Sequence, residues 1–384
     1  MNTKKKIYLD YNATTPVAKL VVAAMLPFFT EKFGNASSDH LFGWDAAEGV
    51  EFAREQVSNL VNCKSTEITF TSGATEASNL GLFGFCKKNS SKGKHIISCK
   101  TEHKAILDTM KALQNQGFQI TYLDVDVEGN IDLEELKNNI TAETILVCLM
   151  LANNETGLIH PMQEIEKIVH ANGAKLMSDI TQAVGKIPVD LKELNLDMAI
   201  FSSHKIYGPK GVGALYINKK NKVEIDQTVF GGGQEKGMRP GTLNVPGIVG
   251  FGKAAEIAAA EMNEEVIRIS KLRNKLEEVL EEIEEVIINS KNSDRLPNTT
   301  NVSFENIDGN NLLRKLNNLA VSRGSACTSN LINPSHVLKA MGLSDELALS
   351  SIRISLGRNT ALADIEFAAE EIKNTIDHLK NAVV

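Results

Sequence analysis

Apolar residues form two alternating patterns between about residues 67 and 218: short continuous runs and longer amphipathic stretches. Short apolar runs predict strands at 67–71, 95–98, 120–125, 144–149, 175–179, 198–202 and 213–217. Amphipathic stretches between them predict helices near 76–87, 104–116, 133–139 and 162–171. Such alternation is typical of a mostly parallel sheet with helices on both faces. We therefore expect an α/β fold that binds its ligand outside the carboxyl ends of the strands.

The pattern changes after residue 247. It predicts a long charged helix over about 250–285, short strands at 300–304 and 351–355, and a final helix over 362–379. The chain has 384 residues, which is enough for two domains. We expect a large domain over 16–250 and a smaller α/β domain formed by 1–15 and 251–384.

Composition narrows the possible partners and the compartment. The formal net charge of −7 argues against a general nucleic-acid surface or an anionic membrane as partner. The longest apolar stretch, 17–29, is too short to span a bilayer, and no secretory signal is evident. The five cysteines show no Cys-x-x-Cys spacing, which favours reduced thiols in a cytoplasmic protein.

The segment around Lys205 carries the first chemical signal. Lys205 follows an apolar strand and the residues Ser202, Ser203 and His204, and it precedes a glycine-proline turn. A lysine in a dry, fixed position stays partly neutral and can form a Schiff base. The hydroxyls and the imidazole can hold a phosphate, so the segment points to pyridoxal phosphate. By itself, it fits a strand that ends in polar loop residues equally well.

Other strand ends carry polar side chains that suit the same cofactor. Ala74 and Thr75 open a helix whose free N–H groups can hold a phosphate, although Ser72 or Thr75 would also serve as an ordinary helix cap. Asp179 ends a strand and could bond a pyridine nitrogen, and Gln182 could bond the ring's phenolic oxygen.

Two loop residues extend this set. His103 could stack on the ring and move protons, and Asn154 could bond cofactor or substrate. A solvated loop histidine and a simple Asn-Gly turn remain the alternatives for these two positions.

A single cysteine gives the second strong signal. Cys327 lies among small polar residues in a loop over about 322–335, where a mobile nucleophile is a better interpretation than a structural thiol. Arg353 lies in an otherwise apolar strand and could clamp a carboxylate, or form a structural salt bridge. The glycine-rich stretch 231–233, followed by Thr242, suggests backbone that passes close to a ligand or another subunit.

Together these segments resemble the pyridoxal-phosphate cysteine desulfurases of the class V aminotransferase family, the NifS/IscS-like group with a long cysteine loop. The resemblance is carried by Tyr-Leu-Asp-Tyr-Asn-Ala-Thr-Thr at 8–15, Gly-Ala-Thr-Glu at 73–76, Asn-Asn-Glu-Thr-Gly at 153–157, Ser-Ser-His-Lys at 202–205 and Gly-Ser-Ala-Cys-Thr-Ser at 324–329. It covers almost the whole chain. It implies the aspartate-aminotransferase-type fold (fold type I), with a mostly parallel seven-stranded sheet, in a homodimer.

The resemblance also implies the reaction. L-cysteine would give L-alanine and a persulfide on Cys327, with Lys205 removing the α-proton and His103 moving a proton near the sulfur. The persulfide would pass to an acceptor or scaffold protein for iron-sulfur cluster assembly, with tRNA thiolation as a further route. No intrinsic metal is implied; Cys327 would at most meet a cluster on the scaffold transiently.

The site residues follow in the same way. Asn154 and Arg353 would bind the substrate. The cofactor would be held by Ala74, Thr75, His103, Asn154, Asp179, Gln182, Ser202, Ser203, His204, Lys205 and, from the neighbouring subunit, Thr242.

Three positions depart from the family pattern: Arg323, Pro240 and Ile180. They put the mobility of the cysteine loop and the cofactor fit in question, not the reaction class. The competing interpretations are a related transaminase or selenocysteine lyase, and a sulfur-carrier or docking protein without turnover. The presence of Lys205 argues against the docking protein.

Overall fold

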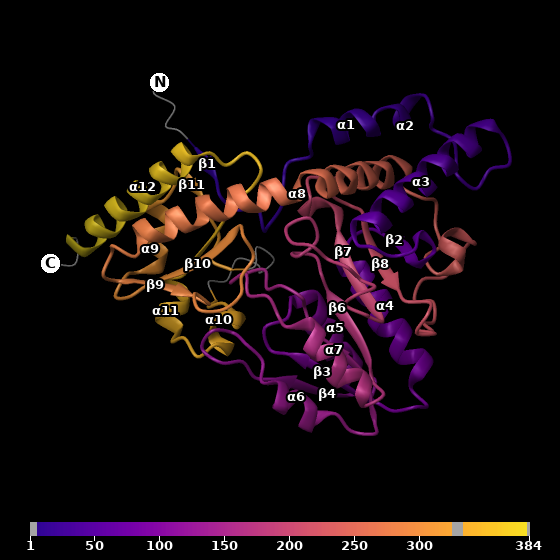
Figure 1. Cartoon of the computed structure of the whole chain (residues 1–384), viewed down its shortest axis with the longest axis horizontal. Helices are drawn as coiled ribbons and strands as arrows, with labels where there is room; N and C mark the ends of the chain where they lie inside the picture. Colours follow the sequence, from indigo (N-terminus) through magenta and orange to yellow (C-terminus); the bar gives the residue numbers. More distant parts are fainter. Residues whose placement is uncertain (1–5, 325–332, 382–384) are drawn as a thin grey trace.

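The computed structural model describes residues 6–324 and 333–381. The chain forms a large region around a seven-stranded sheet and a smaller α/β region, and the long helix α8 (Val245–Leu280) runs along both (Figure 1). The α/β class and the second, smaller region agree with the prediction. Within the described residues, no helix is both long and apolar enough to cross a membrane.

The seven-stranded sheet has the order β2-β8-β7-β6-β5-β3-β4. Only β8 runs antiparallel to its neighbours, so the sheet is mostly parallel, as predicted. Its strands are β2 (Ile68–Thr71), β3 (His95–Cys99), β4 (Gln119–Leu123), β5 (Thr144–Cys148), β6 (Lys175–Asp179), β7 (Met198–Ser202) and β8 (Gly213–Ile217). All seven were predicted, with bounds that differ by two residues at most.

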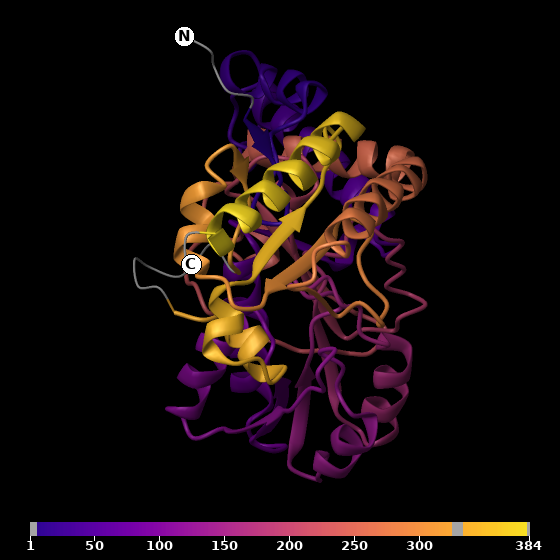
Figure 2. The same ribbon diagram turned by 90° about the vertical axis from the view of Figure 1, so that its left-hand side faces the viewer.

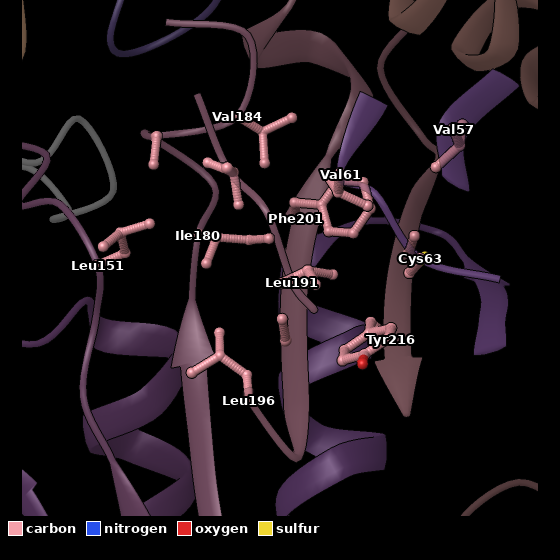
Figure 3. Close-up of a cluster of buried hydrophobic side chains, with 14 of the residues drawn as sticks. Val57, Val61, Cys63, Leu151, Ile180, Val184, Leu191, Leu196, Phe201 and Tyr216 are labelled. Carbon is pink, nitrogen blue, oxygen red and sulfur yellow. The ribbon is translucent and has the colours of Figure 1, made fainter. Parts of the chain in front are cut away.

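Helices cover both faces of this sheet. Alternate strand side chains pack on α3 (Leu41–Leu60), α6 (Leu133–Asn139), α7 (Met162–Ala171) and the first half of α8; Figure 3 shows part of this core around Phe201 and Ile180. The opposite face packs on α4 (Ala74–Asn89) and α5 (Lys104–Gln114). Successive residues of a strand point to opposite faces of the sheet. Because helices cover both faces, the strands can be apolar on both sides, which explains the continuous apolar runs in the sequence.

The smaller region is built on a three-stranded antiparallel sheet of order β12-β10-β9. Its helix α12, yellow in Figure 2, packs on this sheet, and a short parallel pair joins β1 to β11 (Figure 1). The elements are β1 (Ile7–Tyr8), β9 (Val286–Asn289), β10 (Thr299–Phe304), β11 (Leu319–Ala320), β12 (Ile352–Ser355), α9 (Gly309–Lys315), α10 (His336–Ala340), α11 (Asp345–Leu349) and α12 (Leu362–Asn381).

The long helix differs from its predicted range of 250–285. It begins earlier because the Asn244 side chain accepts a hydrogen bond from Gly247 N and Pro246 occupies the first turn. It ends at Leu280, and a turn then leads into β9. Since α8 packs on both hydrophobic cores, the predicted domain division at residues 15 and 250 stays a prediction.

The N-terminal part contributes two helices ahead of α3. These are α1 (Lys19–Met25) and α2 (Pro27–Thr30), which lie beside α8 (Figure 1). Ahead of them, Ile7 and Leu9 are buried in the core of the smaller region.

Candidate active site

A cleft of about 380 Å³ lies at the carboxyl ends of the parallel strands. Segments that follow β2, β3, β5, β6 and β7 line it, together with the N-terminal residues Asn12 and Ala13 and with Arg353 on β12. The cleft thus gathers most of the predicted site residues: Ala74, Thr75, His103, Asn154, Asp179, Gln182, Ser202, His204, Lys205 and Arg353. They meet because the carboxyl ends of parallel strands share one edge of the sheet.

Two predicted residues lie elsewhere. Ser203 is buried next to the cleft without lining it, and Thr242 is exposed on the surface. Cys327 lies outside the described residues, as does most of its predicted loop. The two described ends of that loop contact the site: Ser322 pairs with Arg353 by backbone hydrogen bonds, and Ser335 donates a hydrogen bond to Glu155, next to Asn154.

Lys205 lies in a short 3-10 turn (Ser203–Lys205) directly after β7. Its Nζ donates hydrogen bonds to the backbone carbonyls of Asn12 and Ala13, at 2.5 and 2.8 Å. The turn requires glycine at position 208, because a Cβ there would lie 2.0 Å from the Ser203 hydroxyl. The amine is therefore held at the wall of the cleft by backbone atoms of the N-terminal segment.

The turn between β2 and α4 leaves backbone N–H groups facing the cleft. Gly73 has a φ of +154°, and no side chain caps α4, which excludes Ser72 and Thr75 as caps. Glu76 accepts a hydrogen bond from Ser72 N and pairs with Arg239 at 2.7 Å. Although burial raises the pKa of Glu76, these hydrogen bonds bring it below its usual value. A 16-residue helix that begins without a cap is suited to bind an anion.

His204 stands beside this turn and is neutral near pH 7. Burial lowers the pKa of His204 to about 4, and the charges of Lys205, Lys210 and Lys186 add to the effect. Its Nδ1 lies 3.1 Å from the Thr14 hydroxyl. A neutral imidazole can donate a hydrogen bond from one nitrogen to an anion without adding a charge.

Asp179, Gln182 and His103 also line the cleft. Asp179 is buried at the end of β6, where it accepts a hydrogen bond from Thr181 N. His103 caps α5 by accepting a hydrogen bond from Ala105 N at 3.1 Å. Ile180, one of the three positions that depart from the family pattern, is fully buried in the core between the sheet and helices α3, α6, α7 and α8 (Figure 3). It therefore does not narrow the cleft.

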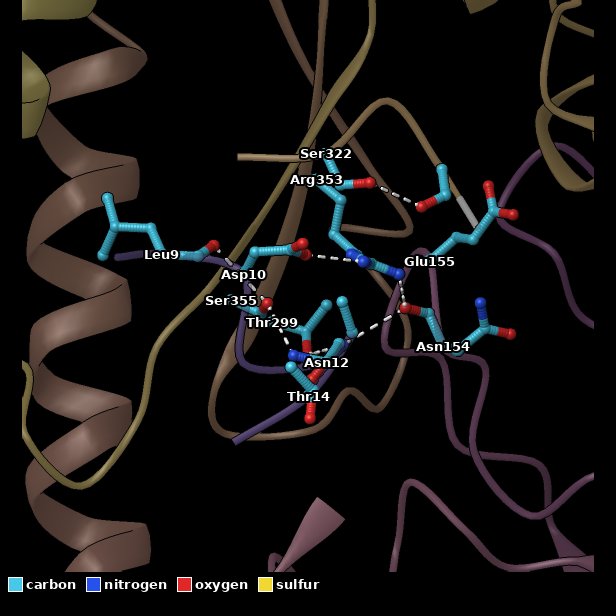
Figure 4. Close-up of polar contacts among 12 residues, drawn as sticks. Leu9, Asp10, Asn12, Thr14, Asn154, Glu155, Thr299, Ser322, Arg353 and Ser355 are labelled. Atoms are coloured by element: carbon cyan, nitrogen blue, oxygen red, sulfur yellow. Dashed lines mark hydrogen bonds and ion pairs between the residues drawn. The ribbon is translucent and has the colours of Figure 1, made fainter. Parts of the chain in front are cut away.

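Arg353 reaches the cleft from the smaller region and is almost fully buried. Its Nη2 pairs with Asp10 at 2.7 Å, and its Nη1 donates a hydrogen bond to the Asn154 carbonyl at 2.9 Å (Figure 4). The structural salt bridge considered from the sequence is therefore present. The hydrogen bond from Arg353 to the Asn154 carbonyl joins the two regions beside the cleft.

Three residues of the site were not predicted from the sequence. Asn12 is buried and its carbonyl accepts hydrogen bonds from Lys205 and Gln182. Lys186 is bonded to the side chains of Asn12 and Gln182. Glu102 is fully buried next to His103, and burial, with Asp179 nearby, raises the pKa of Glu102 well above its usual value. The only sequence signal for them was their place in segments 8–15, 101–104 and 179–186.

Known proteins resemble this chain over almost its whole length. The model of the family "Aminotransferase class-V" matches residues 7–367. The chain is 48% identical over 379 residues to a protein of Anaeromyxobacter sp. (strain Fw109-5) named "Cysteine desulfurase IscS", covering 98% of this chain and 94% of that protein. A protein of the same name from Neisseria meningitidis (serogroup C / serotype 2a) is also 48% identical, with 99% and 94% of the two chains covered.

Solved structures of similar proteins also superpose on this chain over most of its length. A "NIFS-like protein" superposes with a TM-score of 0.91 at 39% identity, over 97% of this chain and 100% of that one. A structure titled "SspA in complex with cysteine" gives a TM-score of 0.82 at 35% identity, over 92% and 99% of the two chains.

Proposed function

The chain belongs to the aminotransferase class-V family as a cysteine desulfurase, and from this premise we propose that it binds pyridoxal phosphate at Lys205 and moves sulfur from L-cysteine to Cys327. The observation that carries the proposal is the meeting of Lys205, Asp179 and Arg353 around one cleft, at the point where the two regions join. The structure titled as a complex of SspA with cysteine supports the choice of substrate.

The residues of the cleft fit the cofactor. Its volume of about 380 Å³ lies in the range of small-ligand sites. The uncapped start of α4 with Ala74 and Thr75, together with Ser202 and His204, would hold the phosphate. Asp179 would bond the ring nitrogen, Gln182 the phenolic oxygen, and His103 would stack on the ring. When bound, pyridoxal phosphate supplies an electron sink for the α-carbon of an amino acid.

The chain's own residues would then perform the remaining steps. Arg353 would bind the substrate carboxylate, and the amine of Lys205 would take the α-proton. The Cys327 thiolate would attack the substrate sulfur, so that an S–S bond forms and the C–S bond of L-cysteine breaks. The electrons of the broken bond stay with the carbon, which is protonated to give alanine. Cys327 keeps the sulfur as a persulfide.

We also propose a homodimer in which Thr242 reaches the partner's cofactor. Thr242 is exposed in the single chain, which leaves it accessible to a second subunit. A surface formed by α1–α3 and the residues near 230 carries many exposed large apolar side chains, as an interface between subunits requires. These are Leu20, Leu26, Phe29, Phe33, Leu41, Phe42, Trp44, Phe52 and Phe230.

We also propose an acceptor for the persulfide sulfur and a cellular compartment for the protein. The persulfide sulfur would pass to an acceptor or scaffold protein, as the IscS name of the relatives suggests. The four described cysteines are free and buried, which suits a reducing compartment such as the cytoplasm.

Incubation with L-cysteine and a reductant tests the reaction, with alanine and sulfide measured together. We expect both products in equal amounts from the wild type, and neither from Cys327→Ser, which should still bind the cofactor. Cys63→Ala is the matched control, because Cys63 is a thiol outside the cleft. A cofactor-loaded wild type that forms neither product would overturn the proposal.

The attachment point is tested by reduction with borohydride and peptide mapping. We expect the cofactor on the peptide with Lys205, and no covalent cofactor in Lys205→Ala. Label on the peptide with Lys186 instead would contradict the assignment.

A further inference from the structure

We infer that Lys186 is a positioning residue, which fixes the side-chain amide of Gln182 so that its N–H group faces the cleft. The inference rests on the proposed function, because the group that Gln182 would meet is the ring oxygen of the cofactor. Lys186 Nζ donates hydrogen bonds to Gln182 Oε1 at 2.5 Å and to Asn12 Oδ1 at 3.1 Å.

The chemistry of these partners determines which end of the Gln182 side-chain amide faces Lys186. Both contacts of Lys186 are carbonyl oxygens, which only accept, and an amine donates whether or not it is protonated. Gln182 Oε1 must therefore point to Lys186. Its Nε2 then donates one hydrogen bond to the Asn12 carbonyl at 3.0 Å, and its second N–H is left for the cleft that Gln182 lines.

Asn12 cannot fix the amide as well by itself. It contacts only the Nε2 end of the amide, through its backbone carbonyl. Lys186 gives Gln182 a separate anchor at the opposite end of the amide. Without that anchor, the amide could turn by half a rotation about its last side-chain bond and present Oε1 to an electron-rich oxygen, which would be repulsive.

The surroundings of Lys186 favour this role over that of a free cation. Lys186 lines a second cavity of about 40 Å³ together with Lys205 and Tyr207. Burial, followed by the charges of Lys205 and Arg353, lowers the pKa of Lys186 well below its usual value. Because an amine donates in either protonation state, the hydrogen bonds from Lys186 to Gln182 and Asn12 do not depend on its charge.

The test is a double-mutant cycle on the cofactor-loaded enzyme with Lys186→Met, Gln182→Ala and the double variant. The readout is the pH at which the absorbance of the bound cofactor changes, with turnover as a second measurement. A donor to the ring oxygen stabilises its anionic form, so losing the donor raises this pH. We expect Lys186→Met to raise the midpoint by about one unit, the size of one hydrogen bond to a charged group, and to lower turnover roughly tenfold.

The second arm of the cycle separates positioning from charge. If Lys186 acts through Gln182, adding Lys186→Met to Gln182→Ala should produce no further shift. An equal shift in both backgrounds would show a direct effect of the lysine and overturn the inference, as would no shift in either. Lys192→Met, at an exposed lysine nearby that bonds Asn62, is the matched control and should change nothing.

Two further outcomes are distinguishable. Should Lys186→Met not fold, as judged by its thermal unfolding, Lys186→Leu serves as the second variant with the same expected shift. A wild type that takes up no cofactor would overturn the proposed function and this inference together. Cofactor uptake with an unchanged midpoint in the Lys186 variant would overturn only the inference.

Discussion

Arg353 and Asp10 form an ion pair at 2.7 Å, although the two residues are separated by almost the whole chain (Figure 4). The pair occupies one edge of the guanidinium group that would bind the substrate carboxylate. Arg353 Nε is buried and has no hydrogen-bond partner among the described residues, so the guanidinium does not use all its donors within the chain. An incoming carboxylate would therefore meet a cation that Asp10 already partly neutralises.

Asp10→Asn should consequently strengthen substrate binding. The amide keeps an acceptor for Arg353 but removes the competing negative charge, so KM for L-cysteine should fall by roughly three- to tenfold while kcat changes little. Steady-state kinetics at several cysteine concentrations measure both constants. Asp108→Asn, an exposed carboxylate away from the cleft, is the control. A raised KM would instead mean that Asp10 orients Arg353 more than it competes.

A second ion pair holds the glycine-rich segment that precedes Thr242. Glu235 binds both Nη atoms of Arg54 at 2.8 Å and accepts a hydrogen bond from Phe70 N. Because its carboxylate is buried, Glu235→Ala leaves the buried Arg54 guanidinium with only the exposed Glu51 as an ionic partner and should lower the free energy of unfolding by about 3–5 kcal/mol.

Urea unfolding of the whole enzyme measures this loss. The double variant Arg54→Met/Glu235→Gln removes the stranded charge and should lose clearly less stability than Glu235→Ala. Glu51→Ala is the control, since Glu51 pairs with the same arginine on the exposed surface and should cost less than about 1 kcal/mol. Equal losses in the single and double variants would count against the buried pair.

Asn12→Ala should destabilise the junction between the two regions. The Asn12 side chain donates hydrogen bonds to Thr299 and to the Asn154 carbonyl, and it accepts them from Asn298 and Lys186. Removing it leaves several buried polar groups unpaired, at about 1–3 kcal/mol each, so we expect a loss of at least about 2 kcal/mol. Urea unfolding checks this. Asn292→Ala, which removes an exposed bond to Glu128, should have little effect.

His160 should make the enzyme sensitive to acid. Burial lowers the pKa of His160 to about 4, and neither ring nitrogen has a hydrogen-bond partner within residues 6–324 and 333–381. The unfolded chain binds the proton at higher pH than the folded chain does. The contribution of His160 is therefore fully present above about pH 6.5 and is lost as the pH falls towards 4.

His160→Leu should remove this dependence. Relative to the wild type, the variant should gain about 3 kcal/mol of stability between pH 6.5 and pH 4, measured by urea unfolding at a series of pH values. A constant difference between the two proteins across that range would contradict the assignment.

The sequence could predict the sheet because each strand is a short, continuous apolar run between amphipathic helices. It did not predict α3, and the composition of that helix explains why. Its buried side includes small residues such as Gly43, Ala46 and Ala53, while Trp44 and Phe52 are exposed. Small inward residues and large outward ones obscure the helical period that identifies the other helices.

The residues of the candidate site also fall into those that the sequence could predict and those that it could not. Ten predicted residues line the cleft because strand ends are visible in the sequence and their polar side chains stand out against apolar runs. Asn12 and Lys186 were missed because their roles depend on contacts between residues 12, 182, 186 and 298, which no local pattern reveals. A half-buried lysine whose partners are two amides resembles any surface lysine when only its neighbours in sequence are known.

The parallel pairing of β1 with β11 has a consequence for biosynthesis. Ile7 and Tyr8 leave the ribosome first, yet their partners Leu319 and Ala320 are made more than three hundred residues later. The segment that carries Asp10, Asn12 and Ala13 must therefore wait, unanchored, until translation is almost complete. A nascent chain cannot hold Lys205 and Arg353 in their final positions, so the reactive centre matures only once nearly all of the polypeptide has been synthesised.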